Sequence, residues 1–178
     1  MKKLLLLLFV VVFSLTQLLA QESTFKQGDK VLNLGIGFGS SYYSGFYTSH
    51  TPALSASLEF NVKDGILEKG SIGIGGYVGY SSAKYSTYWK STNFLIGARG
   101  SFHYPLVDKL DTYTGLLLGY NVYSTKYLDN TYTTGGSASA LAFAWFAGAR
   151  YYFSNNFAVM GEVGYGIAYL TLGVSLKF

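Results

Sequence analysis

Apolar residues take every second position in the last stretch of this chain, and the same alternation recurs in seven earlier stretches. In the closing "YLTLGVSLKF", apolar residues from Leu170 to Phe178 alternate with Thr171, Gly173, Ser175 and Lys177. A period of two over about ten residues is typical of a β-strand whose two faces differ. A helix would scatter the apolar positions around its axis, and each glycine inside it would cost about 1 kcal/mol. The pattern predicts an all-β fold.

The alternating segments are joined in sequence and share one composition: large apolar residues on one face and Gly, Ser, Asn or Ala on the other. They begin with "VLNLGIGFGS", "ALSASLEFNVK", "SIGIGGYVGYS" and "TNFLIGARGSFHY". They continue with "TYTGLLLGYNVY", "ALAFAWFAGARYYF", "FAVMGEVGYG" and the closing stretch. Eight such strands can close into a soluble barrel or sandwich, or into a membrane barrel with its large apolar face outward.

The strand face that carries Gly, Ser, Asn and Ala favours the membrane barrel. Only 12% of the residues are charged, against about 25% in soluble domains. Exposed strands of soluble proteins usually carry Lys, Glu and Thr, whereas Gly, Ser and Ala suit the narrow lumen of an eight-stranded barrel. Tyr, Trp and Phe near the strand ends match the aromatic girdles of membrane interfaces. The sequence therefore predicts an eight-stranded antiparallel up-and-down transmembrane β-barrel.

A secretory signal peptide is expected before the barrel. Lys2 and Lys3 precede the apolar segment 4–13, which is too short for a comfortable membrane span; the alternative is an uncleaved anchor. Removing residues 1–20 takes away two of the 13 basic residues, so nothing indicates nucleic-acid binding. The expected organisation is residues 1–20 as signal peptide, 21–29 as a short periplasmic lead-in and 30–178 as the barrel.

The terminal Phe178 fits a strand that ends at the periplasmic rim. There it would join a girdle of outward aromatic residues. The last strand must also pair with the first, because an unpaired backbone edge in lipid costs several kcal/mol per group. The expected members of the lower girdle are Phe60, Phe102, Tyr151, Phe157 and Phe178.

The signal peptide, the eight amphipathic segments and the tail "LGVSLKF" together resemble the small outer-membrane β-barrel proteins of the OmpX and OmpA-barrel type. The Gly- and Tyr-rich strands and the short last hairpin "GYGIAYLTLG" look like the version common in Bacteroidetes. The resemblance covers residues 30–178. It implies residence in the bacterial outer membrane, in contact with lipid and lipopolysaccharide, and recognition of Phe178 by the barrel-assembly machinery as an insertion signal.

The connections between strands sort into two ends, with both termini expected in the periplasm. The outer loops are rich in Tyr, Ser and Thr, and Tyr gives recognition loops contact area at low entropic cost. Their aromatics would contact an extracellular ligand, or only sit at headgroup level. Periplasmic turns are expected at 64–70, 105–111 and 154–156, and outer connections at 43–52, 82–91, 124–137 and, very short, around 167–169. The contact candidates are Tyr43, Phe46, Tyr47, Tyr85, Tyr88, Trp89, Tyr127 and Tyr132.

The expected function is that of a structural, surface-exposed barrel, in envelope integrity or in adhesion and ligand contact. The alternative is a lipid A-modifying acyltransferase or deacylase, a class of barrel enzyme that uses a His with a Ser and a carboxylate. His103 is expected as a lumen filler, and His50 lies in an outer loop far from an acid, so no local motif supports a triad. Eight strands leave no aqueous pore. We expect no enzyme, no cofactor and no metal site, because two distant His give no ligand spacing.

Five charged residues fall on the inward face and come from five different strands. A lone charge in a narrow lumen would cost several kcal/mol of desolvation, so the set predicts a salt-bridge network across the lumen. Glu162 and Arg150 are expected as a direct pair, because a short turn joins their strands. Arg99 is expected to reach Glu59 or Glu162. The whole set is Glu59, Arg99, Arg150, Glu162 and Lys177.

Overall fold

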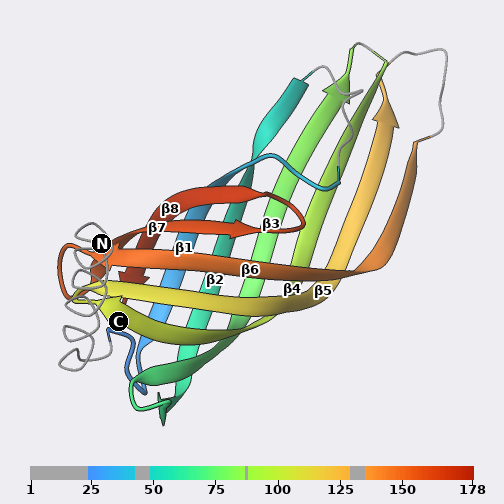
Figure 1. Cartoon of the computed structure of the whole chain (residues 1–178). Coiled ribbons are helices and arrows are strands. Elements are labelled where there is room, and N and C mark those ends of the chain that lie inside the picture. The colour runs from blue at the N-terminus through green and yellow to red at the C-terminus, as the bar shows by residue number, and fades with distance from the viewer. Residues whose placement is uncertain (1–23, 43–48, 87, 129–134) are drawn as a thin grey trace, which may run out of the picture.

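The strands close into one barrel in a computed structural model that describes residues 24–42, 49–86, 88–128 and 135–178 (Figure 1). Each strand pairs antiparallel with its neighbour in the chain, and the last pairs with the first. This is the up-and-down barrel that the alternation predicts. The strands are β1 (Lys30–Phe38), β2 (Ser49–Ile66), β3 (Gly70–Tyr85), β4 (Trp89–Val107), β5 (Leu110–Tyr127), β6 (Gly136–Tyr152), β7 (Phe157–Gly164) and β8 (Leu170–Lys177).

The alternation places the large apolar residues on the outside of the barrel. In β5, Leu118 is 56% exposed, whereas its neighbour Leu117 is 4% exposed and lies in the lumen. In β4, Phe94 and Ile96 are exposed in the same way. This exposed apolar face is the lipid-facing face, and the predicted assignment of outward and inward residues is confirmed on these strands. None of the described residues forms a helix long and apolar enough to span a membrane.

β2 to β6 are longer than the alternation predicted. They contain 16 to 19 residues, whereas β1, β7 and β8 contain 8 or 9. Much of the three expected long outer loops is therefore paired strand, and the β3–β4 loop shrinks to residues 86–88. Thr and Tyr favour pleated strands, and nearly every residue in these stretches has a cross-strand partner. The loop assignment is wrong for residues 49–52, 82–85, 89–91, 124–127 and 136–137.

The long strands extend beyond β1, β7 and β8, at the upper right of Figure 1. The base of this extension is one row of pairs, in which Ser81 lies opposite Asn93, Asn93 opposite Tyr123, and Tyr123 opposite Ala138. β6 pairs with β7 only over 146–152. The part of β6 before residue 146 thus has only β5 as a neighbour among the described strands. We call residues 49–53, 81–85, 89–93, 123–127 and 136–140 the projecting sheet.

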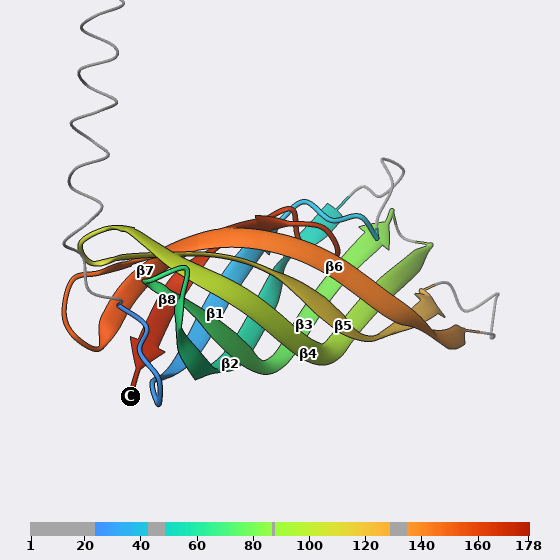
Figure 2. The ribbon, with the colours of Figure 1, turned by 60° about the horizontal axis from the view of Figure 1, so that its bottom comes forward.

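Both chain ends meet at the opposite end of the barrel, which we call the periplasmic end. Lys30 N donates to Phe178 O and Phe178 N donates to Lys30 O, each at 2.9 Å, so the last residue closes the sheet against β1. The side chain of Phe178 is 63% exposed, and Phe60, Tyr151 and Phe157 are also exposed at this end. Figure 2 shows the strands running obliquely around the barrel wall, as closure of a barrel requires.

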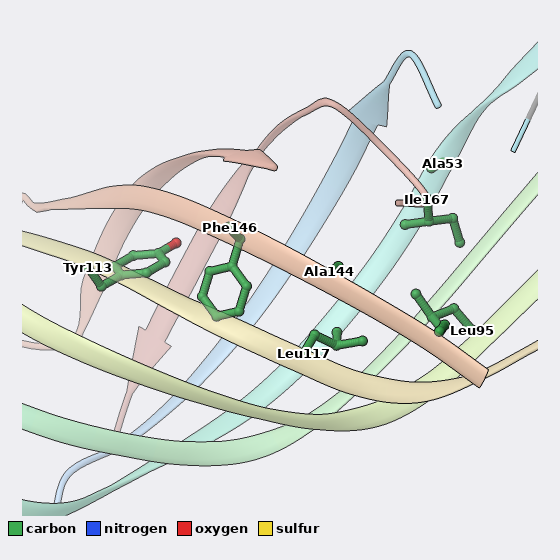
Figure 3. Packing of buried hydrophobic residues seen from close by; sticks show 8 residues of the cluster. Ala53, Leu95, Tyr113, Leu117, Ala144, Phe146 and Ile167 are labelled. Carbon is green, nitrogen blue, oxygen red and sulfur yellow. The ribbon is translucent and has the colours of Figure 1, made fainter. Parts of the chain in front are cut away.

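The outer half of the lumen is filled with apolar side chains (Figure 3). Leu95, Leu117 and Phe146 come from the wall, and Ile167 reaches them from the β7–β8 connection. Gly166 has a φ of 125°, which favours glycine, and its carbonyl accepts a hydrogen bond from Ser41 N at 3.0 Å. Beside this layer lies a cavity of about 30 Å³, enough for about one water molecule.

Candidate functional site

A buried polar cluster occupies the periplasmic half of the lumen, and Arg150 lies at its centre. The Arg150 guanidinium is fully buried and donates from Nη1 to Asp111 Oδ2 at 3.0 Å and from Nη2 to Glu59 Oε2. Asp111 lies directly opposite Arg150 in the β5–β6 register, whereas Glu59 reaches it from β2 across the lumen. Glu59 and Asp111 are buried as well. One cation therefore compensates two carboxylates that water does not reach.

His103 joins the two carboxylates from a third strand. Its Nδ1 lies 2.9 Å from Asp111 Oδ1, and its Nε2 lies 3.1 Å from Glu59 Oε1. Ser101 Oγ lies 3.0 Å from the same Nε2 and donates to Glu59 Oε1. His103 is thus more than the lumen filler that we expected, because both of its ring nitrogens are held by the cluster.

Gly73 creates the space in which Glu59 and Ser101 meet. An added Cβ at this position would lie 2.6 Å from Glu59 Oε1 and 2.8 Å from Ser101 Oγ. Gly73 sits on β3, between the strands of its two neighbours. A side chain at this position would separate Glu59 from Ser101, so the glycine on β3 lets polar residues of β2 and β4 contact each other.

Arg99 and Glu162 form a second ion pair above the cluster. Arg99 Nη2 lies 2.7 Å from Glu162 Oε2, and the guanidinium carbon of Arg99 lies 3.8 Å from the centre of the Phe146 ring. Tyr113 links this pair to the cluster: its hydroxyl donates to Glu162 Oε2 at 3.2 Å, and its ring centre lies 4.5 Å from the guanidinium carbon of Arg150. Stacking on aromatic rings stabilises desolvated guanidinium groups.

The lead-in before β1 folds under the barrel and closes the cluster from the periplasmic end. Phe25 is fully buried, and its ring centre lies 4.5 Å from that of His103. The Phe25 carbonyl accepts hydrogen bonds from Asn61 Nδ2 at 2.7 Å and from Ser71 Oγ at 3.2 Å. The sequence predicts only a short periplasmic lead-in here and gives it no role in the lumen. The signal that could have found the plug is Phe25 itself, the one aromatic residue between Gln21 and Asp29.

Two expectations about the lumen charges are wrong. Arg150 pairs with Glu59 and Asp111 and not with Glu162, because Gly148, not Arg150, lies opposite Glu162 in the β6–β7 register. Lys177 lies at the rim and not in the central network: its Nζ is 3.5 Å from Asp29 Oδ2 and donates to Thr24 O at 2.9 Å. Arg99 contacts Glu162, one of the two partners expected for it. Asp111 was missed because it was assigned to a turn.

Ser101, His103 and Asp111 have the order of contacts of a serine–histidine–aspartate triad. Such a triad needs a serine hydroxyl that gives its proton to the imidazole and an open space where a reacting carbonyl can sit. Here Ser101 donates to Glu59 and is 5% exposed, and Phe25 covers His103. The arrangement is a buried hydrogen-bonded cluster. The described residues contain no group of three His, Asp, Glu or Cys placed to hold a metal ion.

The expected outer contact residues are spread over the end of the projecting sheet. Tyr88 and Tyr127 are 56% and 46% exposed, and Trp89 lies opposite Tyr127 in the β4–β5 register. Tyr85 lies opposite Trp89 on β3, and His50 lies near the start of β2. Tyr43, Phe46, Tyr47 and Tyr132 lie outside the described residues, as does the expected signal peptide.

Comparison with known proteins finds similar structures but no similar sequence. No protein-family model and no curated protein sequence matches the chain. The attachment invasion locus protein Ail of Yersinia pestis, solved with the heparin analogue sucrose octasulfate, is 13% identical, with a TM-score of 0.57 over 86% of this chain and 100% of Ail. The N-terminal β-barrel domain of Pseudomonas aeruginosa OprF is 15% identical, with a TM-score of 0.53 over 85% of this chain and 98% of that domain. A de novo designed transmembrane β-barrel is 16% identical, with a TM-score of 0.54 over 86% of this chain and 98% of the design.

These similarities define the class of the protein. It is an eight-stranded transmembrane β-barrel with the fold of small outer-membrane proteins. At such low identity the likeness extends to the fold alone. Any role must therefore be argued from the geometry of this chain.

Proposed function

We propose that the protein is a non-enzymatic barrel of the bacterial outer membrane whose projecting sheet contacts a ligand outside the cell. The observation that carries this proposal is the unequal length of the strands. Bilayers need about 9–11 residues of each tilted strand, whereas β2 to β6 contain 16 to 19. The excess residues are gathered at the end opposite the chain termini, which is the outer end if both termini lie in the periplasm.

The composition of the projecting sheet supports contact with a partner. Most of its residues are Tyr, Ser, Thr, Ala, Asn and Lys, Trp89 is the first residue of β4, and Tyr127 is half exposed. Such residues give broad polar contacts at low entropic cost. The start of β6 borders only β5 among the described strands, and an edge of this kind can pair with an extended segment of another chain.

The lumen supports a structural role for the buried cluster and argues against the alternative of a lipid A-modifying enzyme. Its Ser101 and His103 are buried and Phe25 covers His103, whereas an enzyme of that class must expose its triad to lipid. We expect the same lipid A mass spectrum from a strain that expresses the protein and from one that lacks it. If expression of the protein changes the number of acyl chains on lipid A, and expression of the Ser101→Ala variant does not, the proposal is contradicted.

Ligand contact is tested by shortening the projecting sheet at its base. In the shortened variant, tight turns join Ser81 to Asn93 and Tyr123 to Ala138, which are cross-strand partners in the same row. The probe is immobilised heparin, chosen because Ail was solved with a heparin analogue, and desulfated heparin tests for charge. We expect cells that display the full protein to adhere and cells that display the shortened variant to adhere at background level.

A matched control keeps the sheet and changes the other end of the barrel. In the control, a tight turn of unrelated sequence replaces the β2–β3 turn at 67–69. Heat-modified gel mobility shows that each variant has folded. Equal adherence by the shortened variant and the full protein, or no adherence by the full protein, would overturn the proposed contact surface for this class of ligand.

A further inference from the structure

A cleft opens at the periplasmic end of the barrel, beside the lead-in. Its volume is about 160 Å³, several times the roughly 30 Å³ that one water molecule takes up in the liquid. It lies between the lead-in, the β4–β5 turn, the β6–β7 turn and the last residues of β8. No acidic side chain lines it. Six of its lining residues have a side chain that can donate a hydrogen bond: Thr24, Lys109, Tyr152, Ser154, Asn155 and Lys177.

Hydrogen bonds between the four segments hold the walls of the cleft in place. Tyr152 N donates to Lys109 O at 2.8 Å, which joins the end of β6 to the β4–β5 turn. Lys177 N donates to Asn156 O at 2.8 Å, which joins β8 to the β6–β7 turn. The lead-in is attached by Lys177 Nζ, which donates to Thr24 O at 2.9 Å. A ligand therefore meets a formed site and has little chain to order when it binds.

Two hydroxyl groups of the cleft have no hydrogen-bond partner among the described residues. They are Tyr152 Oη and Thr24 Oγ1, and both atoms are buried. The whole Tyr152 side chain is only 5% exposed. Arg150 Nε also has no partner, so it is not hydrogen-bonded to the Tyr152 hydroxyl. Buried hydroxyls without a partner are rare and costly, so these two indicate a hydrogen-bond acceptor that binds in the cleft.

The charges of the cleft favour an acceptor with one negative charge. Lys177 Nζ lies 3.5 Å from Asp29 Oδ2, which compensates part of its charge. Lys109 is exposed and forms no ion pair with any described residue. Asp108 precedes Lys109 in the turn but does not line the cleft. About one positive charge is thus left uncompensated, which matches a carboxylate better than a doubly charged phosphate.

We propose that this cleft binds a carboxylate, carried by a small acid or by the end of a short peptide in the periplasm. Lys109 supplies the charge, and the hydroxyls of Tyr152 and Thr24 donate to the carboxylate oxygens, which accept several hydrogen bonds. Because Thr24 belongs to the lead-in and Lys109 to the wall, the bound carboxylate links the lead-in to the barrel. The site lies at the end opposite the projecting sheet, so it is separate from the ligand contact proposed above. Only the periplasmic source of the ligand rests on the proposed orientation.

The test is an NMR titration of the full barrel in phosphatidylcholine nanodiscs. The probes are N-acetylalanine, its uncharged amide, acetate and inorganic phosphate. We expect both carboxylates to shift the amide signals of Ser154 and Asn155 saturably and the uncharged amide to shift neither. Tighter binding of N-acetylalanine than of acetate supports a peptide end as the ligand, and equal binding supports a small acid. No saturable shift with either carboxylate, or tighter binding of phosphate, would overturn the site.

Matched variants test the groups that the proposal assigns. Lys109→Gln should weaken binding of N-acetylalanine about tenfold, as expected for loss of a hydrogen bond to a charged group. Its control is Lys63→Gln, an exposed lysine that does not line the cleft. Tyr152→Phe removes only the hydroxyl and should weaken binding several-fold, whereas Tyr151→Phe, at a residue that does not line the cleft, should change nothing. Equal affinities in each variant and its control would overturn the assignment, and heat-modified gel mobility shows that each variant has folded.

Hydrogen exchange of the lead-in gives a second measurement that a merely structural role would not change. Gln27 N donates to Asp64 Oδ2 at 2.6 Å, so exchange of this amide reports detachment of the lead-in. N-acetylalanine should slow that exchange several-fold in the wild type and have no such effect in Lys109→Gln at the same concentration. Unchanged exchange in the wild type at saturation would overturn the link through Thr24. Adherence to heparin depends on the projecting sheet alone, so either proposal can fail while the other stands.

Discussion

The buried cluster and the projecting sheet are both built on antiparallel strands, but they place their charged residues in opposite environments. In the cluster, Glu59, Asp111 and Arg150 are almost completely removed from water, and both carboxylates contact the Arg150 guanidinium. In the projecting sheet, Lys84, Lys90 and Lys126 lie side by side with the same sign of charge. Charges in the first region have their partners inside the chain. The facing lysines of the second region have the same sign of charge and repel each other across the strand register.

This difference separates stability from binding. Removing one member of a buried ion pair leaves the other stranded in a low dielectric, whereas an exposed lysine contributes little to stability. We therefore expect substitutions in the lumen to act on the free energy of unfolding and substitutions in the projecting sheet to act on binding. The following experiments test that separation, from the largest expected change in stability to the smallest.

Arg150→Met should cause the largest loss of stability, about 3–5 kcal/mol, because it leaves the buried Glu59 and Asp111 without their cation. The measurement is urea unfolding in lipid vesicles. In a double-mutant cycle, Arg150→Met and Glu59→Gln should couple by about 2 kcal/mol, while Arg150→Met and Glu162→Gln should be nearly additive. Strong coupling to Glu162 and none to Glu59 would contradict the contacts of the cluster.

Phe25→Ala should destabilise the barrel by about 3 kcal/mol, the lower end for removal of a buried aromatic side chain, because the lead-in can detach while the barrel wall remains. We expect faster hydrogen exchange at the amides around His103 as water enters from the periplasmic end. The control is Gln27→Ala, whose side chain is exposed on the same segment. Equal effects of the two substitutions would show that Phe25 is not the plug.

Leu118→Arg should cost about 2–4 kcal/mol, because Leu118 faces the lipid near the middle of the band. The matched substitution is Leu117→Ala on the inward side, which should cost about 2–3 kcal/mol through a cavity in the lumen. Leu118→Ala should cost much less than either. If Leu118→Arg unfolds at the same urea concentration as the wild type in defined lipid, the facing of β5 is wrong.

Cysteines introduced at Ser86 and Ser137 should leave stability within about 0.5 kcal/mol of the wild type, as expected for surface positions. Both should react with a membrane-impermeant maleimide on intact cells, because they lie at the end opposite the chain termini. A cysteine at Asp108, in the turn between β4 and β5, should react only after the outer membrane is opened. The reverse pattern of labelling would invert the proposed orientation.

The alternation of residue types was sufficient to predict the strand number, the inward and outward faces and the closure at Phe178. These properties depend on local periodicity, and lipid on one side enforces that periodicity in every strand. Strand length was predicted less well, because a strand that leaves the membrane no longer needs an apolar face. Its Ser, Thr and Tyr residues then look like a loop, as between residues 82 and 91.

Which lumen charges meet depended on the tertiary structure. The pairing of Arg150 with Asp111 depends on the exact register of β5 against β6, and a shift of one residue would turn either side chain to the lipid. The contact with Glu59 depends on barrel closure and on the space that Gly73 leaves. The sequence alone predicts which polar side chains face inward, because the solvation cost of each residue depends on its own chemistry. The ion-pair partner of each charged residue is decided by the closed barrel, because only closure brings side chains from distant strands close enough to pair.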